Sequence, residues 1–205
     1  MQLQCNNTKV KTGFSLVELL VSMALTVIIL GGAVAVYHSA LSTRERESGR
    51  VDAITSAQAA LSVMSREIGN AGYGLDDSNG LVLEDCDGTK IRVRANVNNA
   101  DGVTTSNGED IMYYHDDSSK SVVRFDRNSG VTSGIINRVS EVDFEYHNYY
   151  DDGSYDKVAD TVYTAKVTIK LKVMLPDVPG QPSGREEVVT SDVTLRNAPY
   201  VLGRY

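Results

Sequence analysis

An apolar segment near the N-terminus is the feature that most restricts how this chain can fold. Residues 14–37 contain one charged side chain, Glu18, whereas the rest of the chain is polar and rich in turn-forming residues. A helix needs about 20 apolar residues to cross the hydrocarbon core of a membrane, so this segment is long enough to do so. Residues 1–13 before it are polar and basic. We therefore expect a single-pass, membrane-anchored chain with one modest soluble domain.

The helical pattern continues past the apolar segment without a break. Residues 38–74 carry apolar side chains at spacings of three and four, which places them on one helical face. No proline occurs before Pro176, and glycines cluster at positions 69–74, where we expect the helix to end. We predict one nearly continuous helix from about Ser15 to Ile68. Its predicted buried face consists of Val51, Ile54, Ala57, Leu61, Met64 and Ile68.

Residues 75–205 are expected to form a β-rich domain, because from Leu81 onward the sequence follows a period of two, which predicts short β-strands. The clearest are Glu141–Tyr146, with an acidic polar face, and Lys166–Leu175, with a lysine-rich one. Opposite charges across strands favour pairing, so we predict an antiparallel hairpin of these two, connected by Tyr149–Asp160. The other expected strands are Lys90–Ala95, Asp110–His115, Val122–Asp126 and Val188–Arg196. The predicted fold class is α+β, with one long N-terminal helix whose second half packs on an antiparallel β-sheet.

Charge and motif content argue against two classes of function. The net charge is −7 at pH 7, whereas nucleic-acid binding relies on dense Lys and Arg, so we expect no nucleic-acid contact by this chain. The sequence has no nucleophile elbow, zinc-binding helix motif, Cys-x-x-Cys pair or phosphate-binding glycine loop. We therefore predict that the protein is not an enzyme. The histidines, interpreted as structural, are His38, His115 and His147.

The two cysteines are expected to stay apart. Cys5 lies beside Lys9 and Lys11, which the positive-inside rule keeps in the cytoplasm, whereas Cys86 follows the apolar segment. We expect no internal disulfide, and we interpret Cys86 as a small buried residue.

The most informative residues are Lys11-Thr12-Gly13-Phe14-Ser15-Leu16-Val17-Glu18. A basic leader, a glycine, a phenylalanine and a glutamate four residues later inside an apolar run resemble the processing site of type IV prepilins and type II secretion pseudopilins. The resemblance implies a pilin-like fold. It also implies that a prepilin peptidase cleaves between Gly13 and Phe14, removing residues 1–13, and that the new N-terminus at Phe14 is methylated.

Glu18 needs a physical explanation. A carboxylate at the centre of a membrane helix costs about 2.5–3.5 kcal/mol on insertion scales, and less near an end. Cleavage would create an ammonium group at Phe14, one helical turn away. In the family, this glutamate is thought to pair with the N-terminus of a neighbouring subunit, so the resemblance gives Glu18 a role in subunit assembly.

Further residues resemble one branch of the family. Residues 64–74, Val142–Tyr146 and Asp192–Asn197 are similar to minor pilins of the PilW group, and the J-type pseudopilin shares this outline. The resemblance implies a subunit of the initiating or tip complex of a type IV pilus. Its partners would be the prepilin peptidase, other minor and major pilins, the inner-membrane assembly platform and, before assembly, membrane lipid. The domain would enter the periplasm and then the extracellular pilus.

Several alternatives remain open. They are a J-like pseudopilin, an ordinary secretory signal, a plain anchor and a membrane-anchored adhesin using Tyr113-Tyr114 and Tyr146–Tyr150. We expect no cofactor, although weak calcium candidates occur at Asp151, Asp152 and Asp156 and in residues 85–88. Their spacing matches no known calcium loop, and such runs are also ordinary turns.

Overall fold

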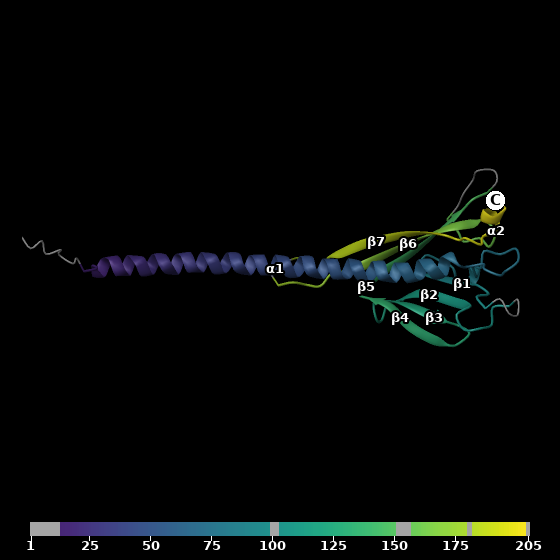
Figure 1. Cartoon of the computed structure of the whole chain (residues 1–205), viewed down its shortest axis with the longest axis horizontal. Helices are drawn as coiled ribbons and strands as arrows, with labels where there is room; N and C mark the ends of the chain where they lie inside the picture. The colour runs from purple at the N-terminus through teal and green to yellow at the C-terminus, as the bar shows by residue number, and fades with distance from the viewer. Residues whose placement is uncertain (1–12, 99–102, 151–156, 180–181, 204–205) are drawn as a thin grey trace, which may run out of the picture. The chain divides into compact units, whose positions relative to one another are not determined.

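The computed structural model describes residues 13–98, 103–150, 157–179 and 182–203 (Figure 1). The chain divides into two compact units, Met1–Glu45 and Arg46–Tyr205. Helix α1, Leu16–Gly69, contributes residues to both. Its bounds lie within one residue of the predicted ones. The glycine cluster ends it as expected, because Gly72 (φ 78°) and Gly74 (φ 65°) adopt left-handed backbone conformations that favour glycine.

In the first unit, the described residues consist mainly of the apolar part of α1. The large apolar side chains of residues 14–37 are all exposed, from 48% at Val34 to 81% at Phe14. The hydroxyls of Ser22 and Thr26 donate to the backbone carbonyls of Leu19 and Ser22, at 2.9 and 2.7 Å. These two polar side chains are therefore satisfied by the helix itself. By length and composition, α1 is able to cross a membrane.

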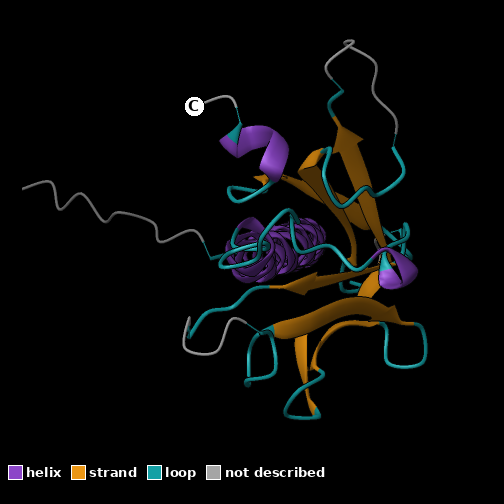
Figure 2. Ribbon diagram, turned by 90° about the vertical axis from the view of Figure 1, so that its right-hand side faces the viewer, coloured by secondary structure: helices purple, strands orange, loops and turns teal. Residues whose placement is uncertain are grey.

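In the second unit, the described residues form seven strands in two antiparallel sheets. The first sheet has the order β1-β2-β3-β4, and the second has the order β5-β6-β7. The second half of α1 lies between the two sheets (Figure 2). A 3₁₀ turn η1, Leu83–Asp85, precedes β1, and a short helix α2, Pro199–Leu202, follows β7. The strands are β1 Lys90–Arg94, β2 Asp110–Asp116, β3 Ser121–Asp126, β4 Val131–Asn137, β5 Val139–Asn148, β6 Thr164–Met174 and β7 Glu186–Thr194.

The core forms where α1 meets both sheets. Ala57, Leu61, Met64 and Ile68 are at most 4% exposed, as the spacing predicted. They pack with inward-facing residues of both sheets, including Ile91, Tyr113, Val122, Phe144, Ile169 and Leu171. One expectation was wrong, because Val51 is 59% exposed. Gly49 and Ala53, four residues apart, face the domain instead. Val51 lies midway between them in the sequence, so its side chain points to the opposite side of the helix.

The helix and the second sheet approach each other closely at Gly49. A Cβ atom at this position would lie 2.4 Å from Cγ and 3.2 Å from Cδ of Pro176, in the loop after β6. Carbon atoms in contact are normally about 3.5–4.0 Å apart, so only glycine fits without a shift. The neighbouring Leu175 and Val178 are buried and hold this loop on the domain.

The predicted charged hairpin is confirmed. β5 pairs with β6, with Glu141 opposite Lys172 and Asp143 opposite Lys170. The Lys170 ammonium lies 2.7 Å from Glu145 and 3.7 Å from Asp143, and Lys172 lies 3.6 Å from Glu141. The four other predicted strands fall on β1, β2, β3 and β7, with boundaries shifted by no more than two residues.

The strands form two antiparallel sheets, whereas one sheet was expected. β4 ends at Asn137 and β5 begins at Val139, so the chain leaves the first sheet at one residue, Arg138, whose φ of 60° turns it sharply. β4 itself was not predicted. Its sequence Val-Thr-Ser-Gly-Ile-Ile-Asn lacks alternation, and its first four residues are exposed on both faces.

Candidate functional site

The described N-terminal residues lead directly into α1. Gly13, Phe14 and Ser15 are non-helical and exposed, and α1 begins at Leu16. The carbonyl of Ser15 accepts a hydrogen bond of 3.1 Å from the backbone N–H of Leu19, which starts the helical ladder. The peptide bond between Gly13 and Phe14 therefore lies in an exposed segment without regular secondary structure. A protease active site is able to bind a segment of this kind.

Glu18 lies in the first turn of α1 and is exposed. No hydrogen bond or ion pair joins its carboxylate to another residue in the described ranges. An acid in the first turn interacts favourably with the helix dipole, typically by about 0.3–1 kcal/mol. That is less than the cost of placing a carboxylate in hydrocarbon, so the side chain has a charge still to be compensated.

A second polar group fixes α1 to the first sheet. Glu67 accepts from the Arg124 side chain, with Nε 2.9 and 3.2 Å from its two oxygens, and from the Tyr113 hydroxyl at 2.5 Å. Burial and the Glu67 carboxylate raise the pKa of Tyr113, so its hydroxyl stays protonated and donates. Sequence analysis missed this group. The signal was an acid directly before Ile68 on the helix face that meets the sheet.

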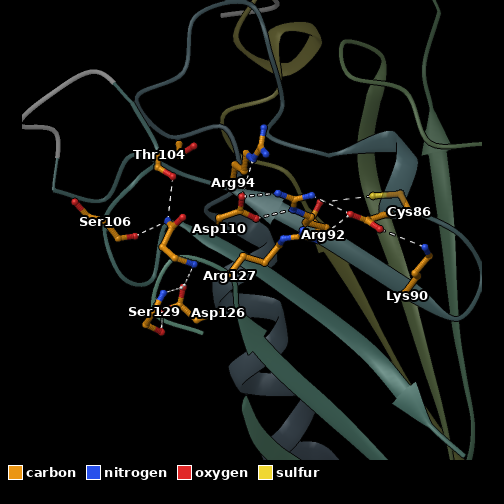
Figure 3. Close-up of polar contacts among 12 residues, drawn as sticks. Cys86, Lys90, Arg92, Arg94, Thr104, Ser106, Asp110, Asp126, Arg127 and Ser129 are labelled. Atoms are coloured by element: carbon orange, nitrogen blue, oxygen red, sulfur yellow. Dashed lines mark hydrogen bonds and ion pairs between the residues drawn. The ribbon is translucent and has the colours of Figure 1, made fainter. Parts of the chain in front are cut away.

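The outer side of β1 carries an ion network centred on Arg92 (Figure 3). Its guanidinium donates to both oxygens of Asp110, each at 2.7 Å, and to Asp85 at 2.9 Å. This bidentate geometry is the strong form of an Arg–carboxylate pair. Asp85 also contacts Lys90 at 3.3 Å and Arg127 at 3.4 Å. The Arg92 hydrogen bond is the largest effect on the pKa of Asp85 and lowers it.

These contacts bear on the calcium candidates. Asp85 already forms ion pairs with three cationic side chains, and Asp87 accepts from the backbone N–H of Thr89 at 2.7 Å. Among the described residues, no group of three or more His, Cys, Asp or Glu side chains is arranged to hold a metal ion. Asp151, Asp152 and Asp156 lie outside the described residues.

The tyrosines considered for an adhesive face divide into buried and exposed ones. Tyr113 is fully buried and Tyr146 is 2% exposed, so both are packing residues. The Tyr146 hydroxyl donates to the carbonyls of Asp87 and Lys90, each at 3.1 Å. Tyr149 is 40% exposed and stacks on Tyr200, with ring centroids 6.0 Å apart.

The remaining candidate side chains have structural contacts. His115 contacts the Val139 carbonyl through Nε2 at 2.9 Å, and His147 contacts the Thr168 hydroxyl at 2.9 Å. Cys86 is partly buried and unpaired, with its thiol 3.6 Å from the Arg92 carbonyl. Burial raises the pKa of the Cys86 thiol, which disfavours the reactive thiolate.

Comparison with known proteins adds one decisive finding. Residues 8–34 match the family model of the prokaryotic N-terminal methylation motif. The chain carries the motif of a pilin or pseudopilin precursor. The match covers Gly13, Phe14 and Glu18 and leaves residues 35–205 outside it. No curated protein and no solved structure matches the chain.

The motif and the structure together support several predictions. The α+β fold, with a long N-terminal apolar helix packed on antiparallel sheets, is pilin-like. Proteins of the pilin family are structural subunits, so the prediction that this precursor is not an enzyme is confirmed. The motif implies processing by a prepilin peptidase and assembly of the precursor. With the apolar part of α1, it indicates an inner-membrane-anchored prepilin with a periplasmic domain.

Proposed function

We propose that this precursor is a minor pilin of the PilW group, cleaved between Gly13 and Phe14, methylated at Phe14 and incorporated into the initiating or tip complex of a type IV pilus. The observation that supports this proposal best is Glu18. Its carboxylate has no cationic partner among the described residues, and it lies in the first turn of α1, where the large apolar side chains of residues 14–37 are exposed. A membrane acid of this kind normally has a functional partner.

The proposed cleavage supplies that partner. Removing residues 1–13 creates an ammonium at Phe14, and the amine stays cationic when methylated. Between neighbouring helices in a low-dielectric environment, the pair of Glu18 and this ammonium is strong, whereas an unpaired Glu18 is costly. Each subunit therefore has one axial position in which the charge of Glu18 is compensated. The exposed apolar side chains of residues 14–37 provide the rest of the contact between subunits.

The proposed division of the chain follows from this role. Residues 1–13 are the leader, 14–37 the transmembrane half of the helix, 38–74 its amphipathic half and 75–205 the β-rich domain. The PilW assignment is supported by the resemblance of residues 64–74 and 192–197. The motif fits a J-like pseudopilin of type II secretion equally, and the genes beside this one, for a pilus or for a secretion system, discriminate the two.

Intact mass and N-terminal sequencing of the mature protein test the processing step. We expect a chain that begins at methylated Phe14. A protein that retains residues 1–13, or one that begins beyond Ala35, would contradict the proposal.

Replacing Glu18 by alanine tests the assembly step. We expect normal cleavage and normal membrane residence, with loss of the subunit from sheared pili. Ser22→Ala is the matched control, because the Ser22 hydroxyl bonds only to its own helix and its removal leaves the charge pair intact. Normal incorporation of the Glu18→Ala protein would favour a plain anchor or an adhesin.

A further inference from the structure

β7 forms an open edge of the second sheet. Within the described residues, no strand pairs with its outer side. The N–H of Leu195 donates to the Ala165 carbonyl at 2.9 Å, which fixes the alternation of hydrogen bonds between β6 and β7. By this alternation, the N–H and C=O groups of Val188, Thr190 and Asp192 point away from β6. Unpaired backbone groups at a sheet edge are a template for pairing with another chain.

The middle of this edge lacks the usual protection. Natural edge strands carry Lys, Pro or inward-pointing charges that prevent unwanted pairing. β7 contains neither lysine nor proline, and residues 188–191 are uncharged. The acids of β7 are each paired with a cation of the same chain, Glu186 with Lys172 at 3.4 Å, Glu187 with Arg50 at 2.8 Å and Asp192 with Lys166 at 3.4 Å. Residues 188–191 are therefore open to backbone pairing.

A groove follows the same edge, because β7 runs alongside α1 (Figure 1). The hydroxyls of Ser65 and Ser191 lie 3.1 Å apart, and the N–H of Arg196 donates to the Gly69 carbonyl at 3.2 Å. Beside these contacts lies a groove of about 510 Å³. Its walls include Gln58, Ser62 and Arg66 from α1, and Val189, Thr190 and Arg196 from β7 and the residues after it.

The two arginines give one end of the groove a positive charge that is not compensated. Arg66 and Arg196 are exposed, and neither forms an ion pair within the described residues. Both lie near Gly69, and none of the described side chains that line the groove is an acid. The chain as a whole has a net charge of −7, so this end is a positive site on an acidic molecule. Charge complementarity therefore selects an anionic group from outside the chain.

The length of the groove fits a short β-strand. Gln58 and Arg66 are separated by about 12 Å along the axis of α1, from a rise of about 1.5 Å per residue. A strand rises about 3.3 Å per residue, so the groove accommodates about four residues of an extended chain. An inorganic anion would occupy the arginine end alone and leave the edge of β7 unpaired. An extended segment that contains an acid would satisfy both.

We propose that this groove binds an extended segment of a neighbouring, non-identical pilin subunit, which adds a strand to β7 and places a carboxylate against Arg66 and Arg196. This inference rests on the proposed function, which makes the other pilins of the initiating or tip complex the neighbours of this chain. Alternate side chains of the added strand face α1, where the short Ser62 leaves room for them. An arginine guanidinium binds a carboxylate through two parallel hydrogen bonds, which fixes the position of the segment along β7.

Photo-cross-linking in cells that carry the assembly machinery tests the proposal. In the full chain, Gln58 is replaced by p-benzoylphenylalanine, which places the photoreactive group in the groove. After irradiation, mass spectrometry identifies the cross-linked peptide. We expect a peptide from the soluble domain of another pilin, with an Asp or Glu among the residues beside the link.

Glu141 on β5 is the control position, because it is exposed and lies outside the groove. The same photoreactive residue at Glu141 should not link to that peptide. A link from Gln58 to a second copy of this chain or to a protein that is not a pilin would overturn the proposal, and so would an equal yield from the two positions.

Arg66→Glu tests the charge in the chain labelled at Gln58. It brings like charges together, so we expect the cross-link yield to fall about tenfold or more. Replacing the acid of the linked peptide by arginine should restore the yield. Arg138→Glu is the matched control, because Arg138 is also exposed and without an ion pair in the described part of the chain, and it lies outside the groove. Equal yields from Arg66→Glu and Arg138→Glu would refute the charge contact.

Thr190→Pro tests the backbone pairing. It removes an outward N–H of β7 without removing a bond to β6, and proline is tolerated at such positions of edge strands. We expect the chain to fold and the cross-link from Gln58 to be lost. Thr190→Ala keeps the N–H and should link normally. Equal yields from these two variants would refute the addition of a strand to β7.

The outcome also separates the two proposals. A processed chain that enters the filament fraction but forms no cross-link from Gln58 refutes the groove contact and leaves the proposed function intact. An unlabelled chain that never enters that fraction refutes the proposed function, and the groove contact with it.

Discussion

Replacing Gly49 by alanine sets two effects of known size against each other. Alanine favours a helix interior by about 1 kcal/mol over glycine. At Gly49, however, the new Cβ would lie 2.4 Å from Cγ of Pro176, more than 1 Å inside the normal contact distance of about 3.5 Å. The proline ring is rigid, and its loop is held by the buried Leu175 and Val178. Overpacking of this kind costs about 1–3 kcal/mol, so we expect a net loss of about 1 kcal/mol.

The sign of the effect depends on the proline. In a Pro176→Ala background the ring is absent, so Gly49→Ala should stabilise the domain by about 1 kcal/mol. Thermal unfolding of the full chain in detergent, followed by the near-ultraviolet circular dichroism of its buried tyrosines, measures both effects. A change of 1 kcal/mol corresponds to about 2–4 °C in a domain of this size.

Ser48→Ala is the control, because Ser48 is an exposed position of the same helix. We expect a change of only a few tenths of a kcal/mol in either background. If Gly49→Ala stabilises the domain equally with and without the proline ring, the close approach does not constrain this position and the reasoning is refuted.

Three further predictions concern the second unit. Glu67→Ala should lower the free energy of unfolding by about 2 kcal/mol in urea, because it leaves the Tyr113 hydroxyl and Arg124 without their acceptor. Gly80→Ala should prevent stable folding, since its Cβ would lie 2.3 Å from backbone atoms of Arg94 and Gly72. Gly130→Ala, also at positive φ but in open space, should cost only about 1–2 kcal/mol. The Arg92 hydrogen bond lowers the pKa of Asp85 in the folded protein below its ordinary value of 3.8. The ionised Asp85 carboxylate therefore contributes its full stabilisation of the fold above pH 3.8, and this contribution is lost as the pH falls through the lowered pKa of the folded state. Asp85→Asn should therefore reduce stability at neutral pH and flatten the acid-unfolding curve below about pH 4.

The features predictable from sequence were those with a strong period or an unusual charge. The helix was predictable because apolar spacing, the absence of proline and the glycine cluster agree on its extent. The β5–β6 hairpin was predictable because acids face lysines across the strands. Glu18 was recognisable because a single charge in an apolar run is conspicuous.

Other features depend on contacts that a sequence pattern does not contain. β4 went unpredicted because a strand exposed on both faces needs no alternation. The separation into two sheets arises at Arg138, where a non-glycine residue adopts φ 60°, a conformation for which the sequence gives no signal. The exposure of Val51 depends on where the sheets cover the helix, and the Glu67 group depends on partners at positions 113 and 124.

The order of the strands has a consequence for how the domain folds. In both sheets, neighbouring strands are also consecutive in the chain. Each sheet is a meander, in which every strand pairs with the next one in the chain. Closing the loop between two such strands costs little conformational entropy. Proteins whose contacts are local in sequence therefore fold quickly. Residues 90–137 are able to pair completely before residues 139–194 take part. The seating of α1, and the contacts of residues 79–90 with the second sheet, join distant parts of the chain, so this docking is the natural kinetic barrier for this domain.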